Sequence, residues 1–163
     1  MSGLDVAAVT AIYDALVSHA SGTGLFSSEV LDHEPLNAPG TGLSCAIMMG
    51  PLVPVGRASG LGKTSGRMEF TAQVATPMTQ LPAGGVDREM LQAAAVLLAA
   101  YSGDFELVTG EIAEGLVRMV DLLGAFGAPL QMAPGWLEFA GTPLRVVRIT
   151  LPLILNDMWG QSS

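Results

Sequence analysis

The sequence is poor in charged residues and in cysteine, and both shortages limit what the protein can be. Only 13% of its 163 residues are charged and 50% are hydrophobic, which is typical of a globular protein with a sizeable core and not of a disordered chain. Cys45 is the only cysteine, so no internal disulfide can form and a reducing compartment is expected. The shortage of charge also favours a surface that other subunits cover in an assembly.

Basic residues are the scarcer of the two charge types. Seven Lys and Arg stand against fifteen Asp and Glu, for a formal net charge of −8, which argues against a protein that grips nucleic acid through its phosphates. The apolar runs Leu91 to Ala100 and Val146 to Leu155 are shorter than the roughly 20 residues of a membrane-spanning helix. The first residues also lack the basic region of a signal peptide, so we expect a soluble protein with no membrane partner.

The spacing of apolar residues predicts two amphipathic helices. Apolar side chains recur every three or four positions from Leu4 to Ala20 and again from Leu91 to Tyr101, which places them along one face of a helix. Asp87 is positioned to cap the second helix at its start, and Gly103 is positioned to end it.

The stretch Pro143 to Trp159, which reads PLRVVRITLPLILNDMW, predicts a long strand. Its odd positions from Val147 to Leu155 are all apolar, whereas Arg148 and Thr150 fall on the other face, as the two-residue period of a strand requires. Pro152 has no amide hydrogen to donate, so this strand is predicted to lie at a sheet edge or to be bulged at that residue.

Further segments combine alternating or β-branched residues with flanking turn residues, and they complete the predicted sheet. These predicted strands are Glu29–Leu31, Leu43–Met49, Arg67–Thr76, 104–108, Leu116–Leu123 and Pro129–Phe139, the last broken near Pro134–Gly135 and forming a hairpin with the final strand. Because strands cluster and do not alternate with helices, we predict a single α+β domain over residues 1–163. Its mostly antiparallel sheet carries two helices packed on one face.

A glycine- and proline-rich stretch at about residues 50–66 is predicted to be a long loop that acts as a mobile contact arm. Its Gly56–Thr64 portion resembles a phosphate-binding loop only superficially. Arg57 occupies the position where that motif needs glycine, and a strand pattern follows Lys63 where the motif needs a helix.

No other pattern predicts catalysis, a cofactor or a metal. His19, His33 and Cys45 are scattered along the chain and do not have the spacing of a metal site, and no serine lies in a nucleophile motif. We therefore predict that the protein is not an enzyme and needs no cofactor. A small cytoplasmic protein that binds a nucleotide or another ligand through the Lys63 loop remains the alternative from a different class.

Three stretches of the chain resemble the small tail-assembly proteins of long-tailed actinobacterial phages: LDVAAVTAIYDALVSHASGTGLF, HEPLNAPGTGL and RVVRITLPLILNDMW. The order helix, strands, helix, strands is similar to that of the tail terminators. This resemblance implies a tail-terminator-like fold and a homohexameric ring that caps the tail tube, ends its polymerisation and joins the tail to the head-completion or connector proteins. It also implies a virion protein of the tail or neck, assembled in the host cytoplasm. Another neck protein, a head–tail stopper or an adaptor, is the alternative within this class.

A ring protein needs contacts between subunits, and the sequence suggests where they lie. Three of the seven basic residues fall in or beside the glycine-rich stretch, where we expect them to dock on an acidic neighbour. The outer face and the end of the final strand are predicted to meet an adjacent subunit, and the acidic remainder to let DNA pass through the ring without specific binding. The predicted interaction residues are Arg57, Lys63, Arg67, Arg148, Thr150 and Trp159.

Overall fold

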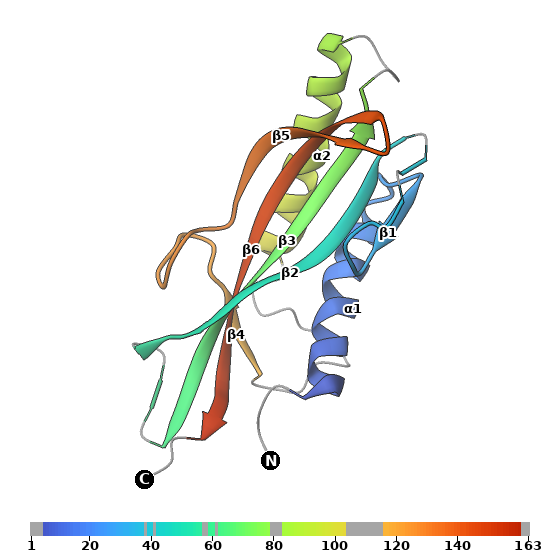
Figure 1. Ribbon diagram of the computed structural model, residues 1–163. Helices are drawn as coiled ribbons and strands as arrows, with labels where there is room; N and C mark the ends of the chain where they lie inside the picture. Colours follow the sequence, from blue (N-terminus) through green and yellow to red (C-terminus); the bar gives the residue numbers. More distant parts are fainter. Residues whose placement is uncertain are drawn as a thin grey trace.

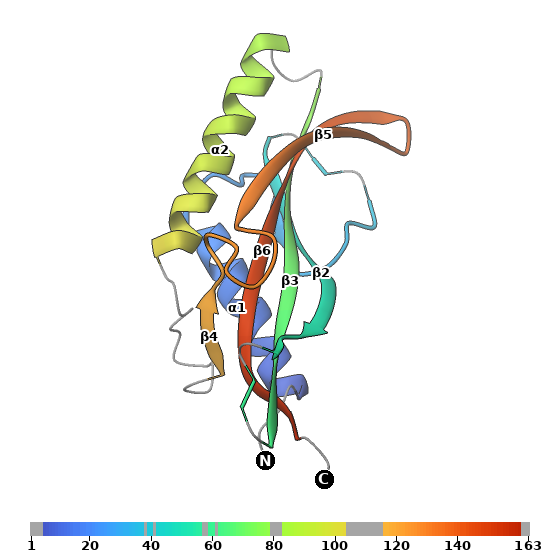
Figure 2. The ribbon, with the colours of Figure 1, turned by 90° about the vertical axis from the view of Figure 1, so that its left-hand side faces the viewer.

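The computed structural model describes residues 5–37, 39–40, 42–56, 59–60, 62–78, 83–103 and 116–160 of the chain. Two helices, α1 (Val6–Gly22) and α2 (Ala83–Gly103), cover one face of a twisted sheet, as Figures 1 and 2 show. The strands are β1 (Glu29–Leu31), β2 (Ser44–Pro54), β3 (Lys63–Pro77), β4 (Val117–Val120), β5 (Gln131–Phe139) and β6 (Thr142–Gly160). The predicted α+β fold class is confirmed.

Strand β6 is the centre of the sheet. The strands follow the order β1-β2-β3-β6-β4, and β5 also pairs with β6. All pairs are antiparallel except β1 with β2, which are parallel. On the side away from β3, β5 pairs with residues 142–150 of β6 and β4 pairs with residues 153–155. The last strand of the chain is therefore hydrogen-bonded to three other strands, β3, β4 and β5.

The apolar row of β6 forms the floor of the core, as predicted. Val147, Ile149, Leu151, Leu153 and Leu155 are all buried and belong to one cluster with the inward side chains of both helices and of β3. Burying a side chain of this size contributes about 2 kcal/mol, so this row is a major source of the stability of the fold.

Both helices begin differently from the prediction. Helix α1 starts at Val6, and the Asp5 carboxylate caps it by accepting a hydrogen bond from the Ala8 amide at 2.8 Å. Helix α2 begins at Ala83, so Asp87 lies within the helix and does not cap it. The Tyr101 hydroxyl donates to the Leu16 carbonyl oxygen at 2.8 Å and ties the two helices together.

Pro152 lies at neither a sheet edge nor a bulge, which corrects the prediction. It faces Glu69 of β3 in an unbroken stretch of the register. On the other side of β6 it falls between the partners of β5, which end at Thr150, and those of β4, which begin at Leu153. The carbonyl of Pro152 accepts from the Asp121 amide at 2.8 Å, and its nitrogen points to that same side. The missing amide hydrogen therefore falls in the gap between two partner strands.

The predicted long loop at residues 50–66 is mostly a strand hairpin, which corrects a second prediction. Strand β2 continues to Pro54 and β3 begins at Lys63, with Leu52 opposite Met68 and Pro54 opposite Gly66. The register shifts between Met49 and Leu52, so the glycine and proline between them form a bulge inside the strand. We call residues 50–66 the β2–β3 arm, and it extends beyond the helices in Figure 1.

Strands β5 and β6 form the predicted hairpin, and its tip projects from the opposite end of the sheet (Figures 1 and 2). Ala140 and Gly141 have φ values of 50° and 83°, the pattern of a tight two-residue turn that matches the twist of the strands. Strand β5 has no break near Pro134, which pairs with Val147. The predicted strand at 104–108 lies outside the described residues.

Candidate functional site

The outer face of β6, opposite the helices, carries two of the predicted interaction residues. Arg148 is exposed, and its Nε donates to Gln73 Oε1 of β3 at 3.1 Å. Thr150 is half-buried between its register partners Thr71 and Gln131. Both side chains therefore lie on the face that the sequence predicts, and their contact with a neighbouring subunit stays a prediction.

Trp159 lies at the end of β6, opposite Thr64 of the β2–β3 arm, and is 39% exposed. Gly66 makes this packing possible. A Cβ at that position would lie 2.7 Å from the Met158 sulfur and 3.4 Å from the indole ring. The aromatic ring thus stabilises the arm from one side and presents its other side to solvent.

Lys63 is the first residue of β3 and is exposed, whereas Arg57 lies outside the described residues. The chain continues from Lys63 as a strand paired with both β2 and β6. A phosphate-binding loop would continue as a helix whose amides face the anion, so the structure supports the rejection of a nucleotide site here.

Arg67 is not part of an exposed contact loop, which corrects its predicted place on the contact arm. Its side chain is 5% exposed, forms an ion pair with Glu69 and donates to the Ala128 carbonyl oxygen. Its Nε also lies 3.8 Å from Asp121 Oδ2, and Asp121 is 1% exposed. Arg67 is therefore a buried structural residue in the single chain, and its side chain offers little surface for a neighbour.

The Asp121 carboxylate also fixes the loop that follows β4. It accepts hydrogen bonds from the Ala125 amide at 2.7 Å and from the Phe126 amide at 2.9 Å. These bonds hold the loop against the sheet while Leu123 stands 94% exposed at its surface. Sequence reasoning missed this arrangement because Asp121 and Arg67 are far apart in the chain and neither lies in a recognisable motif.

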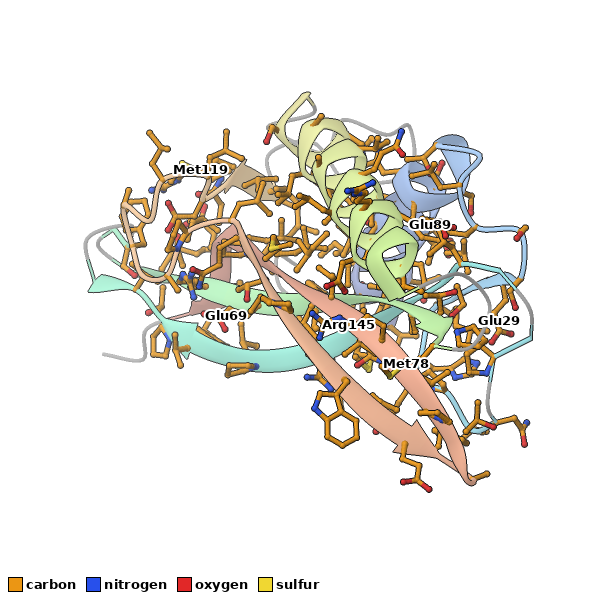
Figure 3. All side chains as sticks on the ribbon, turned by 90° about the horizontal axis from the view of Figure 1, so that it is seen from above. Glu29, Glu69, Met78, Glu89, Met119 and Arg145 are labelled. Carbon is orange, nitrogen blue, oxygen red and sulfur yellow. The ribbon has the colours of Figure 1, made fainter. Side chains whose placement is uncertain are left out.

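A cavity of about 250 Å³, called the β1 cavity below, opens beside β1 on the outer face of the sheet. Its walls are mainly apolar and come from the chain around β1, from β2 and β3, and from the β5–β6 hairpin. Glu29 and Glu34 provide carboxylates, and Gln73 and Arg148 line it from the sheet. Figure 3 shows Glu29 on the opposite side of the molecule from Met119 of β4. The apolar wall residues include Leu31, Pro35, Leu137, Phe139 and Leu144.

A second hollow of about 430 Å³ lies between the start of α2 and the β5–β6 hairpin, lined by Met78, Trp136 and Pro143 among others. Arg145 spans it. Its Nε donates to Asp87 Oδ1 at 2.9 Å and its Nη1 donates to the Gly135 carbonyl oxygen at 2.9 Å. This ion pair fixes the hairpin to α2, and Trp136 remains 67% exposed beside it.

The described residues do not assemble a reactive centre. Cys45 is buried, which raises the pKa of its thiol to about 12 and keeps it protonated and unreactive. Within the described ranges no three His, Cys, Asp or Glu side chains come together as metal ligands, and no helix there is long and apolar enough to cross a membrane. His33 instead contacts the Glu34 carbonyl oxygen through Nδ1 at 2.8 Å.

No protein-family model matches the sequence, and no curated protein matches it significantly. Among solved structures, a protein that carries no functional name is 17% identical over 94% of this chain and 95% of its own, with a TM-score of 0.52. A chain of the virion of a native gene transfer agent particle is 15% identical over 93% of this chain and 99% of its own, with a TM-score of 0.47. The sheath/tube terminator of an extracellular contractile injection system is 15% identical over 100% of this chain and 60% of its own, with a TM-score of 0.41. Likeness at this level describes the fold alone.

Proposed function

We propose that this chain is a structural protein of a phage-type tail. In this proposal it forms a homohexameric ring that caps the tail tube, ends tube polymerisation and joins the tail to the head-completion proteins. It is a virion protein assembled in the host cytoplasm, with no enzymatic activity. The sequence stretches that resemble tail-assembly proteins support this role, and so does the α+β fold that contains them.

The observation that carries the proposal is that two sheet extensions project from the helix-covered core and leave apolar side chains in solvent. Val53 on the β2–β3 arm and Trp159 at the end of β6 are exposed, as are Met78 just after β3 and Trp136 on the hairpin. Clustered exposed apolar residues mark surfaces that bind other proteins. Extensions at opposite ends of the molecule suit a subunit that contacts both a neighbour in its own ring and an adjacent ring.

DNA must pass through such a ring during packaging and ejection, and the net charge of −8 suits that passage. An acidic lining repels phosphates, so the genome slides without specific binding. We expect no retention of a DNA duplex in a gel-shift assay even at low salt. Tight binding at low salt would contradict this part of the proposal.

The purified protein provides the direct test of the role. We expect mass photometry to detect a species of about six subunits, alone or on addition of the cognate tail tube protein. Tube polymerisation followed by electron microscopy should then give shorter tubes with a capped end. A monomer that leaves tube length unchanged would contradict the proposal, and a monomer that binds nucleotide would favour the ligand-binding alternative. Localisation of the chain in the assembled particle separates a terminator from a stopper or an adaptor.

A further inference from the structure

Charge is segregated along this chain. Residues 1–56 contain no Lys or Arg, although they include Glu29, Asp32 and Glu34 close together. No Asp or Glu occurs after Glu34 until Glu69, so the β2–β3 arm carries only the basic residues Arg57 and Lys63. In a protein with net charge −8, an acid-free segment that carries two basic residues is suited to an acidic partner.

The acidic and basic segments lie too far apart to neutralise each other in one molecule. Strand β1 pairs with β2 only as far as Ala46, and β2 then continues to Pro54, a length of about 26 Å at a rise of ~3.3 Å per residue. Lys63 follows beyond the end of that strand. Because the Debye length is about 8 Å at physiological salt, attraction between the two segments of one copy is screened. Figure 1 shows the arm and β1 on different sides of the molecule.

The β1 cavity has the composition that would receive such an arm. Its walls are mainly apolar, and Glu29 and Glu34 both line it, with the exposed Asp32 between them in the chain. The one basic side chain in its lining, Arg148, is held by Gln73. The arm combines the exposed apolar Val53 with the exposed Lys63. Apolar walls accept the apolar side chains of the arm, and carboxylates accept its cations.

We propose that the β1 cavity of each copy receives the β2–β3 arm of the next copy. This proposal rests on the proposed ring and names the contact that closes it. The arm and the cavity are different surfaces, so the contact runs head to tail, and head-to-tail contacts close into a ring when the rotation between subunits allows it. The charge segregation then sets the direction of assembly, because an arm cannot pair with another arm.

Charge reversal tests the contact in the full-length chain. One variant is Lys63→Glu, which places an acid on the arm. The other is Asp32→Lys with Glu34→Lys, which makes the cavity basic. We expect each variant alone to raise the dissociation constant of the assembly about ten-fold or more, since like charges then meet. Mixing the two variants should restore assembly with the two chains alternating around the ring, as should combining all three substitutions in one chain.

The controls are Arg88→Glu on the exposed face of α2, which changes the net charge by −2 as Lys63→Glu does, and Asp14→Lys on the exposed side of α1, which changes it by +2, half the change in the double variant. They should leave the dissociation constant within about two-fold of wild type, and thermal unfolding should show that every variant folds. If wild type forms rings and the reversals do not weaken them, or if mixing does not rescue, this contact is wrong and the proposed function stands. If wild type is a monomer even with tube protein, both proposals are wrong.

Discussion

Replacing Arg67 with methionine tests whether this residue stabilises the core or serves as an interaction residue. Methionine keeps most of the side-chain volume but removes the cation that faces Asp121 and Glu69. At 3.8 Å and an effective dielectric constant of about 20, the attraction between Arg67 and Asp121 is about 4 kcal/mol before desolvation is counted. The variant also loses the hydrogen bond to the Ala128 carbonyl oxygen.

The expected loss of folding stability in Arg67→Met comes from the buried carboxylate that the substitution leaves without a partner. In the native protein the ion pairs with Glu69 and Asp121 compensate for the burial of the Arg67 charge. The variant leaves the Asp121 carboxylate buried without its cation. Removing one partner of a buried ion pair typically costs about 3–5 kcal/mol. That is a large part of the roughly 5–15 kcal/mol that holds most domains folded.

Urea unfolding at low protein concentration, where oligomerisation does not contribute, measures this cost. With a slope of about 2 kcal/mol per molar urea, the midpoint should fall by about 2 M. Arg88→Met, on the exposed face of α2, should change stability by no more than about 0.5 kcal/mol. A loss below about 1 kcal/mol for Arg67→Met would refute the buried cluster and return Arg67 to the list of candidate interaction residues.

Three further changes probe the arm, the hairpin and the core. Gly50→Ala places a Cβ 2.6 Å from the Glu69 carbonyl oxygen, so we expect a loss of about 1–3 kcal/mol and faster hydrogen exchange of the arm amides. Ala140→Asn should raise stability by about 0.5–1 kcal/mol in urea unfolding, because asparagine tolerates the positive φ of 50° better than alanine. Burial raises the pKa of Cys45 from 9.0 to about 12, so the folded state holds a proton that the unfolded state loses in this window. The free energy of unfolding should therefore be unaffected below pH 9 and fall by up to about 1.4 kcal/mol per pH unit between 9 and 12; a flat profile in a comparison with Cys45→Ala would contradict this.

The sequence predicts well whatever local periodicity determines. The alternation of β6 specifies which face is buried, and the helical spacing specifies α1 and α2, because in each case the pattern lies within one element. The predictions fail where the outcome depends on partners distant in the chain. Residues 50–66 have the composition of a loop, yet residues 50–54 and 63–66 belong to strands β2 and β3, because β2 and β3 pair with each other there and β3 also pairs with β6.

The same limit explains why the environments of two residues, Pro152 and Arg67, are predicted wrongly from the sequence. Whether Pro152 can occupy a central strand depends on where β4 and β5 end, which no local pattern shows. Arg67 is buried because Asp121 and Ala128, which lie more than fifty residues further along the chain, pack against it in the fold. Lys63 and Trp159, by contrast, lie at the ends of their strands, where long-range packing changes little, and both are exposed at the arm as the sequence suggests.

The arm is a continuation of the core sheet, and this continuity bears on how the protein would assemble. Strand β6 carries the core row as far as Leu155 and then runs beside the arm to Gly160. Asp157, with φ of 53°, lies in the irregular stretch between these two parts, where its amide donates to the Ser65 hydroxyl oxygen at 3.2 Å. The strand residues of the arm, held in this way, are already ordered before they meet a partner, so binding would cost less conformational entropy than a mobile loop requires.

Trp159→Ala separates the order of the arm from the stability of the core. The indole packs at Gly66 on the arm and is 39% exposed, whereas Leu155 and Met158 are buried in the helix-covered cluster. We expect the variant to unfold in urea within about 1 kcal/mol of wild type, because little buried area is lost. Amide exchange in the β2–β3 arm should nevertheless accelerate, and assembly should weaken even though Lys63 is intact. If assembly weakens with no change in arm exchange, the indole itself touches the neighbour; if neither changes, the arm does not depend on Trp159 and its order comes from β3 alone.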